Sequence, residues 1–148
     1  MITRHYEEMV HAAIGSRRVW VLTIASTVEA LALELFPRQS KDVAADLKSI
    51  EALSAHIDKW SGNNDLKAFA IGAVARRADM TVSKGLRKLV NDKKIRDDGV
   101  KAWNYVRNRV MHGSLVSIYS DKEEDERILA MIELVHELTD EILRRPQT

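Results

Sequence analysis

The sequence contains no cysteine, so the chain forms no disulfide bond and offers no thiolate as a metal ligand. Nothing in it therefore requires an oxidising compartment. An excess of one charge is also missing, because 23 basic and 22 acidic residues leave a formal net charge of +1. This balance excludes a general attraction of the whole protein to polyanions, and any nucleic-acid site has to be local.

Proline is scarce, with two among 148 residues, and no strand-like alternation of useful length appears. Helix formers dominate the segments between the breaks, which predicts an all-α protein. The most apolar run, from Val19 to Phe36, is interrupted by polar residues and begins too far into the chain for a signal peptide. We interpret it as a buried core helix and expect a cytoplasmic protein with no membrane association.

We expect residues 1–148 to form a single helical domain, either a whole protein or one excised from a longer chain. We expect a first helix from Ile2 to Ile14 and a second that is capped by Ser16 and runs to Phe36. Further helices are expected at Lys41 to Trp60, at Asp65 to about Ala78, after Thr81 as a shorter piece, and at Asp98 to His112. A long C-terminal helix should start at the capping box Ser120 to Glu123 and run to about Arg144. Leu47 and Trp60 are expected on a core-facing stripe of the third helix, and Leu66 and Phe69 on that of the fourth.

The segment from Tyr105 to Gly113 concentrates polar chemistry at one helix end, where Gly113 is expected to supply the C-terminal cap. Helical spacing puts Arg107 inside an apolar stripe formed by Val100, Trp103, Val106, Val110 and Met111. A guanidinium there needs a carboxylate, a route to solvent or a polar cleft. Glu29 is the leading candidate partner, although it is equally compatible with a position at the surface. If the pair is buried, removing Glu29 should cost roughly 3 kcal/mol or more.

Asn108 and His112 share a different face of this helix with Tyr105. The pattern Arg107-Asn108-x-x-x-His112, followed by Gly113 and another long amphipathic helix, resembles the HEPN family. The stretch from Thr27 to Leu31 looks like that family's first core helix. The resemblance implies a helical bundle that forms a two-fold homodimer with facing motifs. It also implies a metal-independent endoribonuclease without cofactors, or a non-catalytic relative that binds RNA or a protein partner. Some family members are toxins silenced by an antitoxin, and an antiviral role would also rest on analogy.

These residue types suit RNA cleavage without a metal. A base has to deprotonate the ribose 2′-hydroxyl, an acid has to protonate the leaving oxygen, and the charge on the phosphorane has to be held. His112 is suited to the proton transfers and Arg107 to the phosphate oxygens, with Asn108 beside them and with Glu29 and Tyr105 in support. One histidine per chain is short of two catalytic groups, which favours completion of the site by a second chain.

Two other patterns compete with this interpretation. Glu133-x-x-His136, with Asp140 one turn later, is a weak metal-binding signal, because di-iron bundles need a second such motif and two further glutamates. Residues 73–89 read passably as a DNA-binding helix-turn-helix. We interpret the basic residues around this stretch instead as a surface that steers RNA towards the motif, namely Arg76, Arg77, Lys84, Arg87 and Lys88, with Lys93, Lys94 and Arg96 beyond them.

Overall fold

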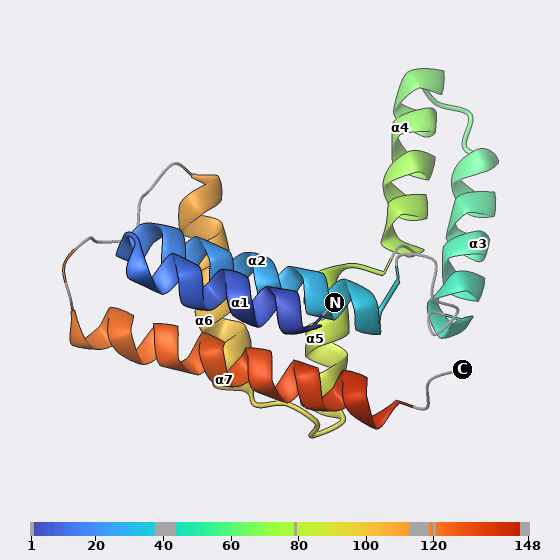
Figure 1. Cartoon of the computed structure of the whole chain (residues 1–148). Coiled ribbons are helices and arrows are strands. Elements are labelled where there is room, and N and C mark those ends of the chain that lie inside the picture. The colour runs from blue at the N-terminus through green and yellow to red at the C-terminus, as the bar shows by residue number, and fades with distance from the viewer. Residues whose placement is uncertain (1, 38–43, 79, 113–118, 120, 146–148) are drawn as a thin grey trace. The chain divides into compact units, whose positions relative to one another are not determined.

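The structure is a computed structural model that describes residues 2–37, 44–78, 80–112, 119 and 121–145. These residues form helices and no strand, so the predicted all-α fold class is confirmed. The helices in chain order are α1 (Ile2–Ile14), α2 (Arg17–Leu35), α3 (Ala44–Asp58), α4 (Asn64–Ala75), the 3₁₀ turn η2 (Arg76–Ala78), α5 (Val82–Asn91), α6 (Asp97–Met111) and α7 (Lys122–Arg144) (Figure 1). Within these described residues, no helix is long and apolar enough to cross a membrane.

The helix starts follow from side chains that accept hydrogen bonds from free backbone N–H groups. The hydroxyl of Ser16 accepts from the backbone of Val19, and the side chain of Asn63 accepts from Asp65 and Leu66. At the start of α7 the capping residue is Asp121, whose carboxylate accepts from Glu123 at 2.8 Å. The expected capping residues Ser120 and Gly113 lie outside the described part of the chain.

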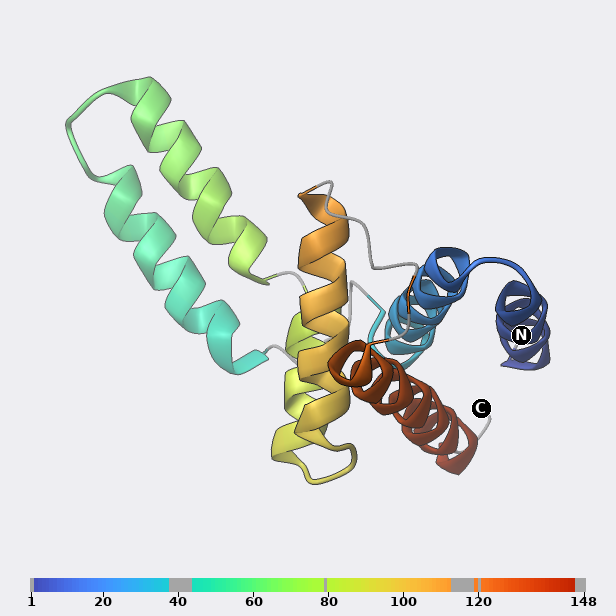
Figure 2. The ribbon, with the colours of Figure 1, turned by 90° about the vertical axis from the view of Figure 1, so that its left-hand side faces the viewer.

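The chain divides into two compact units, of which the first combines residues 1–35 and 82–148. In this unit α2 lies against α1, α5, α6 and α7, and α6 also packs on α7 (Figures 1 and 2). The core contains fully buried apolar side chains from four helices of this unit, and burying a side chain such as Val, Ile, Leu or Met is worth about 1.5–3 kcal/mol. They include Val21, Ile24, Val28 and Leu31 of α2, Leu86 of α5, Trp103 of α6, and Met131, Leu134, Val135 and Leu138 of α7.

The last turn of α6 departs from the predicted apolar stripe. Val100, Trp103 and Val106 are buried as expected, but Val110 is exposed and Met111 is 69% exposed. Helical periodicity identifies which residues share a face, yet it does not show how far neighbouring helices extend along that face. Within the part of the chain that the structure describes, the carboxyl end of α6 therefore presents apolar side chains to solvent.

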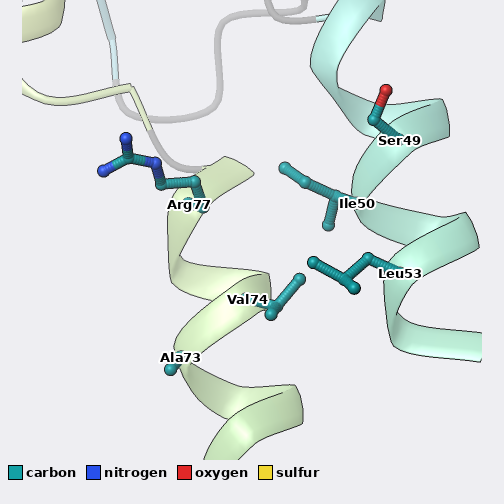
Figure 3. Close-up of a pocket in the computed structure, with 6 residues that line it drawn as sticks. All are labelled: Ser49, Ile50, Leu53, Ala73, Val74 and Arg77. Carbon is teal, nitrogen blue, oxygen red and sulfur yellow. The ribbon is translucent and has the colours of Figure 1, made fainter. Parts of the chain in front are cut away.

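The second unit, residues 36–81, contains α3 and α4, which run side by side in opposite directions (Figure 2). No residue from 47 to 77 is buried. The expectation that Leu47, Trp60, Leu66 and Phe69 face a core is therefore wrong, because all four side chains are exposed. Ile50, Leu53 and Val74 point into an open groove of about 540 Å³ between the helices (Figure 3). Two helices supply only one mutual interface, so their remaining faces stay uncovered within this unit.

Candidate active site

A buried tryptophan sets the register between α2 and α6. Trp103 is fully buried and donates its indole N–H to the carbonyl oxygen of Ala25 at 3.2 Å. One helical turn further along both helices, Arg107 donates its Nε–H to Glu29 at 3.1 Å. Both contacts advance by four residues, so they lie one helical turn apart on each helix, at the place where α6 crosses α2 (Figure 1). The position of Trp103 against α2 therefore places Arg107 within hydrogen-bonding distance of Glu29.

The contact between Glu29 and its leading candidate partner Arg107 is present, but the burial on which the larger stability cost was conditional is not. The Arg107 side chain is 42% exposed and the Glu29 side chain is 43% exposed. The Arg107 guanidinium carbon also lies 5.6 Å from the centre of the Trp103 ring, a distance suited to a cation–π contact. The pair thus holds the guanidinium in one orientation while solvent still reaches it.

An open groove of about 320 Å³ lies beside this ion pair. We call it the Glu29–Arg107 groove. It is lined from α2 by Leu22, Ala25, Ser26 and Glu29, and from α6 by Val106, Arg107, Val110 and Met111. Glu29 uses only Nε of Arg107 in the contact above, so the two terminal nitrogens are the ones suited to an anionic ligand.

Asn108 and His112 are both exposed and do not line the Glu29–Arg107 groove. His112 is the C-cap of α6, and its backbone N–H donates to the carbonyl of Asn108 at 3.1 Å. Arg107 and His112 are five residues apart, which separates them by about 140° around the helix axis. One protomer therefore presents the arginine and the histidine on different sides of the same helix end.

Tyr105 belongs to a separate cluster between α6 and α7. Its hydroxyl accepts a hydrogen bond from Arg109 at 2.9 Å, and the Arg127 guanidinium lies 4.0 Å from the centre of its ring. Arg109 also donates to Glu124 at 3.1 Å. These contacts connect the end of α6 to α7, so Tyr105 helps to hold the motif helix in place.

The basic residues proposed to steer RNA are distributed over both units. Arg76 and Arg77 lie on η2 in the second unit, whereas Lys84, Arg87 and Lys88 lie on α5 in the first. Several basic side chains nearby are held by carboxylates: Lys88 by Asp92, Lys94 by Glu141, and Arg96 by both Glu133 and Glu137. Glu137 and Glu133 raise the pKa of Arg96 above its usual value. Ion pairing therefore reduces the positive field of this surface.

The competing metal and DNA interpretations gain no support from the side-chain contacts. Glu133 binds Arg96, and the Nδ1 atom of His136 lies 3.0 Å from the hydroxyl of Tyr6. Across the described residues, no group of three histidine, aspartate or glutamate side chains is arranged to hold a metal ion. The proposed helix-turn-helix spans the boundary between the units, and α5 packs its buried residues in the first unit, where it contacts α2 and α6.

Apart from Glu29, the α2 side of the groove was not predicted from the sequence. Leu22, Ser26 and Glu29 recur at intervals of four and three residues, which is the spacing of one helical face. That signal was present in the sequence. It did not indicate that this face meets α6 beside Arg107, because only the packing of Trp103 on α2 establishes which helices are neighbours.

No protein-family model, no curated protein and no solved structure matches this chain. The candidate site therefore rests on its own residues and their geometry.

Proposed function

We propose that this protein is a HEPN-like, metal-independent endoribonuclease that acts on single-stranded RNA in the cytoplasm. The site is composite and lies between the two chains of a homodimer, with Arg107, Asn108 and His112 as its central residues. The observation that carries the proposal is the half-exposed Arg107 guanidinium, held in position by Glu29 and Trp103, on a helix that ends at an exposed histidine.

The proposed chemistry assigns a separate task to each group. The terminal nitrogens of Arg107 bind the non-bridging phosphate oxygens and stabilise the negative charge of the phosphorane. An imidazole from one His112 removes the proton from the ribose 2′-hydroxyl, and that oxygen then attacks the phosphorus. The other His112 protonates the leaving 5′-oxygen. The products are a 2′,3′-cyclic phosphate and a free 5′-hydroxyl.

The angular separation of Arg107 and His112 supports a second chain as part of the site. Within one protomer these two side chains leave α6 in different directions, so a single phosphate contacts both only if another copy contributes one of them. Exposed apolar side chains around the Glu29–Arg107 groove, namely Leu22, Val110 and Met111, provide a surface for this contact. Each His112 would then approach the motif of the other chain in an isologous interface, whose total buried area we expect to exceed ~1,000 Å².

The test is cleavage of a single-stranded RNA by the purified protein in excess chelator. Arg107→Ala and His112→Ala should each reduce the rate by about 100-fold or more, because they remove the charge contact and a proton-transfer group. Substrate with 2′-deoxyribose at the cut position should bind and resist cleavage. Wild-type cleavage by His112→Ala, or activity that needs added magnesium, would contradict the proposed mechanism.

A matched control is available on the same helix. Arg109 is also an arginine of the last two turns of α6, but it binds Tyr105 and Glu124 away from the groove. Arg109→Lys keeps the charge and should leave the cleavage rate within a few-fold of wild type. A loss equal to that of Arg107→Ala would show that the assay reports general damage to α6.

The alternative function is a non-catalytic HEPN-like module that binds RNA or a protein partner through the same groove. Its supporting observation is the Glu29 carboxylate, which offsets part of the Arg107 charge at the place where a phosphate would bind. Retained RNA binding without any cleavage would favour this function. Under either function, an antitoxin or a regulatory domain would act by covering the groove.

A further inference from the structure

The outer face of α4 carries apolar surface that its own hairpin does not cover. Phe69 is 69% exposed, and Leu66 is exposed beside it. Only two residues of this helix, Asp65 and Lys67, carry charge, and Lys67 binds Asp58, the last residue of α3, at 3.5 Å. A helix with so few charged positions is usually buried on more than one side. In the second unit, α3 covers one side only.

Four residues form a row along this outer face. Asp65, Phe69, Gly72 and Arg76 follow one another at intervals of four, three and four, which is the spacing of a coiled-coil seam. We call this row the α4 stripe. A Cβ atom built on Gly72 would lie 3.9 Å from Nη1 of Arg76, so the guanidinium lies along the row. Val74, by contrast, points towards α3 (Figure 3).

We propose that a second copy of this chain binds to the α4 stripe, with the two α4 helices antiparallel about a two-fold axis. When Asp65 of one copy faces Arg76 of the other, the same register places Phe69 opposite Gly72. Each contact occurs twice, as an isologous interface requires. The Phe69 ring then occupies the open space above Gly72, next to the Arg76 guanidinium, where a cation–π contact adds to the apolar contact.

Charge and shape both favour this partner. The stripe has a carboxylate at one end and a guanidinium at the other, so antiparallel pairing joins opposite charges, whereas parallel pairing would join like charges. The antiparallel arrangement also opposes the two helix dipoles. With one charge of each sign, the stripe lacks the positive excess that a nucleic acid would require. Phe69 has a large ring and Gly72, three residues later on the same helix, has no side chain. Across the two-fold axis, the ring of one copy therefore fits the space at the glycine of the other.

This interface is separate from the proposed cleavage site, since it contains none of Glu29, Arg107, Asn108 or His112. A chain that uses both surfaces has two isologous contacts and assembles beyond the dimer. A chain that uses the α4 stripe alone forms a dimer.

The test is sedimentation velocity of the full chain over a wide concentration range, comparing wild type with Gly72→Leu. The added side chain fills the space that Phe69 of the other copy would occupy, so the dissociation constant should rise at least ~10-fold and the largest species should lose mass. Within the protomer the nearest atom to this position is 3.9 Å away, and leucine favours helix over glycine, so helicity should be retained. The matched control is Ala55→Leu on α3, another exposed position, which should associate like wild type.

A charge exchange tests the register. Asp65→Lys and Arg76→Glu should each weaken association at least several-fold, because each places like charges across the axis twice. The double variant Asp65→Lys/Arg76→Glu restores opposite charges between the copies and should recover part of the lost affinity. The proposal would be overturned if Gly72→Leu associated like wild type or if wild type stayed monomeric. The α4 stripe would then be free to contact another part of the chain or another protein.

These results remain separable from the proposed function. RNA cleavage that is lost in His112→Ala but retained in Gly72→Leu supports the active site whatever the α4 stripe does. Association that is lost in Gly72→Leu supports the stripe even if no RNA is cleaved.

Discussion

At the scale of single residues, solvent exposure decides how much an ion pair contributes to the free energy of unfolding. Glu29 and Arg107 form the ion pair that the sequence suggested, and each side chain remains more than 40% exposed. Glu141 has the opposite environment, since its side chain is 6% exposed and it contacts Lys94 and Arg144. Two carboxylate pairs with similar distances are therefore expected to differ in their effect on stability.

Glu29→Gln should change the free energy of unfolding by less than about 1 kcal/mol, because solvent screens a half-exposed pair. This value replaces the larger cost expected for a buried pair. Urea denaturation at a concentration where the protein is monomeric measures it, with Glu34→Gln, an exposed position on the same helix, as the control. A loss near 3 kcal/mol under these conditions would show that the pair is shielded from water in the protomer.

Glu141 should make stability depend on pH. Burial raises the pKa of this carboxyl, but hydrogen bonds and charge from Lys94 and Arg144 outweigh burial and lower it below its usual 4.5. A group with a lowered folded-state pKa stabilises the fold above its unfolded-state pKa, and this contribution is lost as the pH falls through the folded-state value. Glu141→Gln should therefore be less stable than wild type by about 1–3 kcal/mol at neutral pH.

The difference between wild type and Glu141→Gln should shrink as the pH falls below the usual carboxyl pKa of 4.5. Urea denaturation of both proteins from neutral to acidic pH measures it. The matched control is Asp140→Asn, because Asp140 is exposed and its ion pair with Arg144 spans 4.0 Å. A difference that stays constant with pH would contradict this account.

At the scale of helices, close approach between α6 and α7 depends on one missing side chain. A Cβ atom on Gly99 would lie 2.8 Å from the carbonyl oxygen of Ala130 and 2.8 Å from Cβ of Leu134. Neither atom is the end of a flexible side chain, so the helices would have to separate. That packing positions α6, and with it the motif residues that follow.

Gly99→Ala should lower the free energy of unfolding by about 1–3 kcal/mol, because the steric cost exceeds the gain in helix propensity. Gly72→Ala is the matched control, since its new Cβ would meet nothing nearer than 3.9 Å and alanine favours the helix. Thermal melts of both variants at a concentration where the protein is monomeric measure the difference. Equal midpoints for the two alanine variants would show that α6 and α7 adjust to the added methyl group.

At the scale of the whole molecule, the proposed site requires the His112 of both chains. A mixed dimer of wild type and His112→Ala has one histidine and lacks either the base or the acid, so its cleavage rate should fall by about 100-fold or more. After random mixing of equal amounts, roughly a quarter of the dimers are wild type, and the activity should be about a quarter of that of the same total amount of wild type. A single-turnover cleavage assay after mixing and re-equilibration measures it. About half of wild-type activity would show that each chain acts without the histidine of the other.

The sequence determined the helical class and most helix boundaries, because these depend on local properties. Periodic apolar residues, caps such as Ser16 and scarce proline act within a few positions of the chain. It also named Glu29 as the leading candidate partner of Arg107, since a cation in an apolar stripe needs a carboxylate and Glu29 is a carboxylate in the most apolar segment of the chain.

Tertiary structure alone decided what those residues experience. The exposure of Phe69, Val110 and Met111 depends on how far neighbouring helices extend, which no periodicity encodes. Likewise, the groove beside Arg107 exists because Trp103 binds the backbone of Ala25, a contact between positions 78 residues apart. Burial, and with it the strength of each charge contact, is a property of packed surfaces and not of the order of residues along one helix.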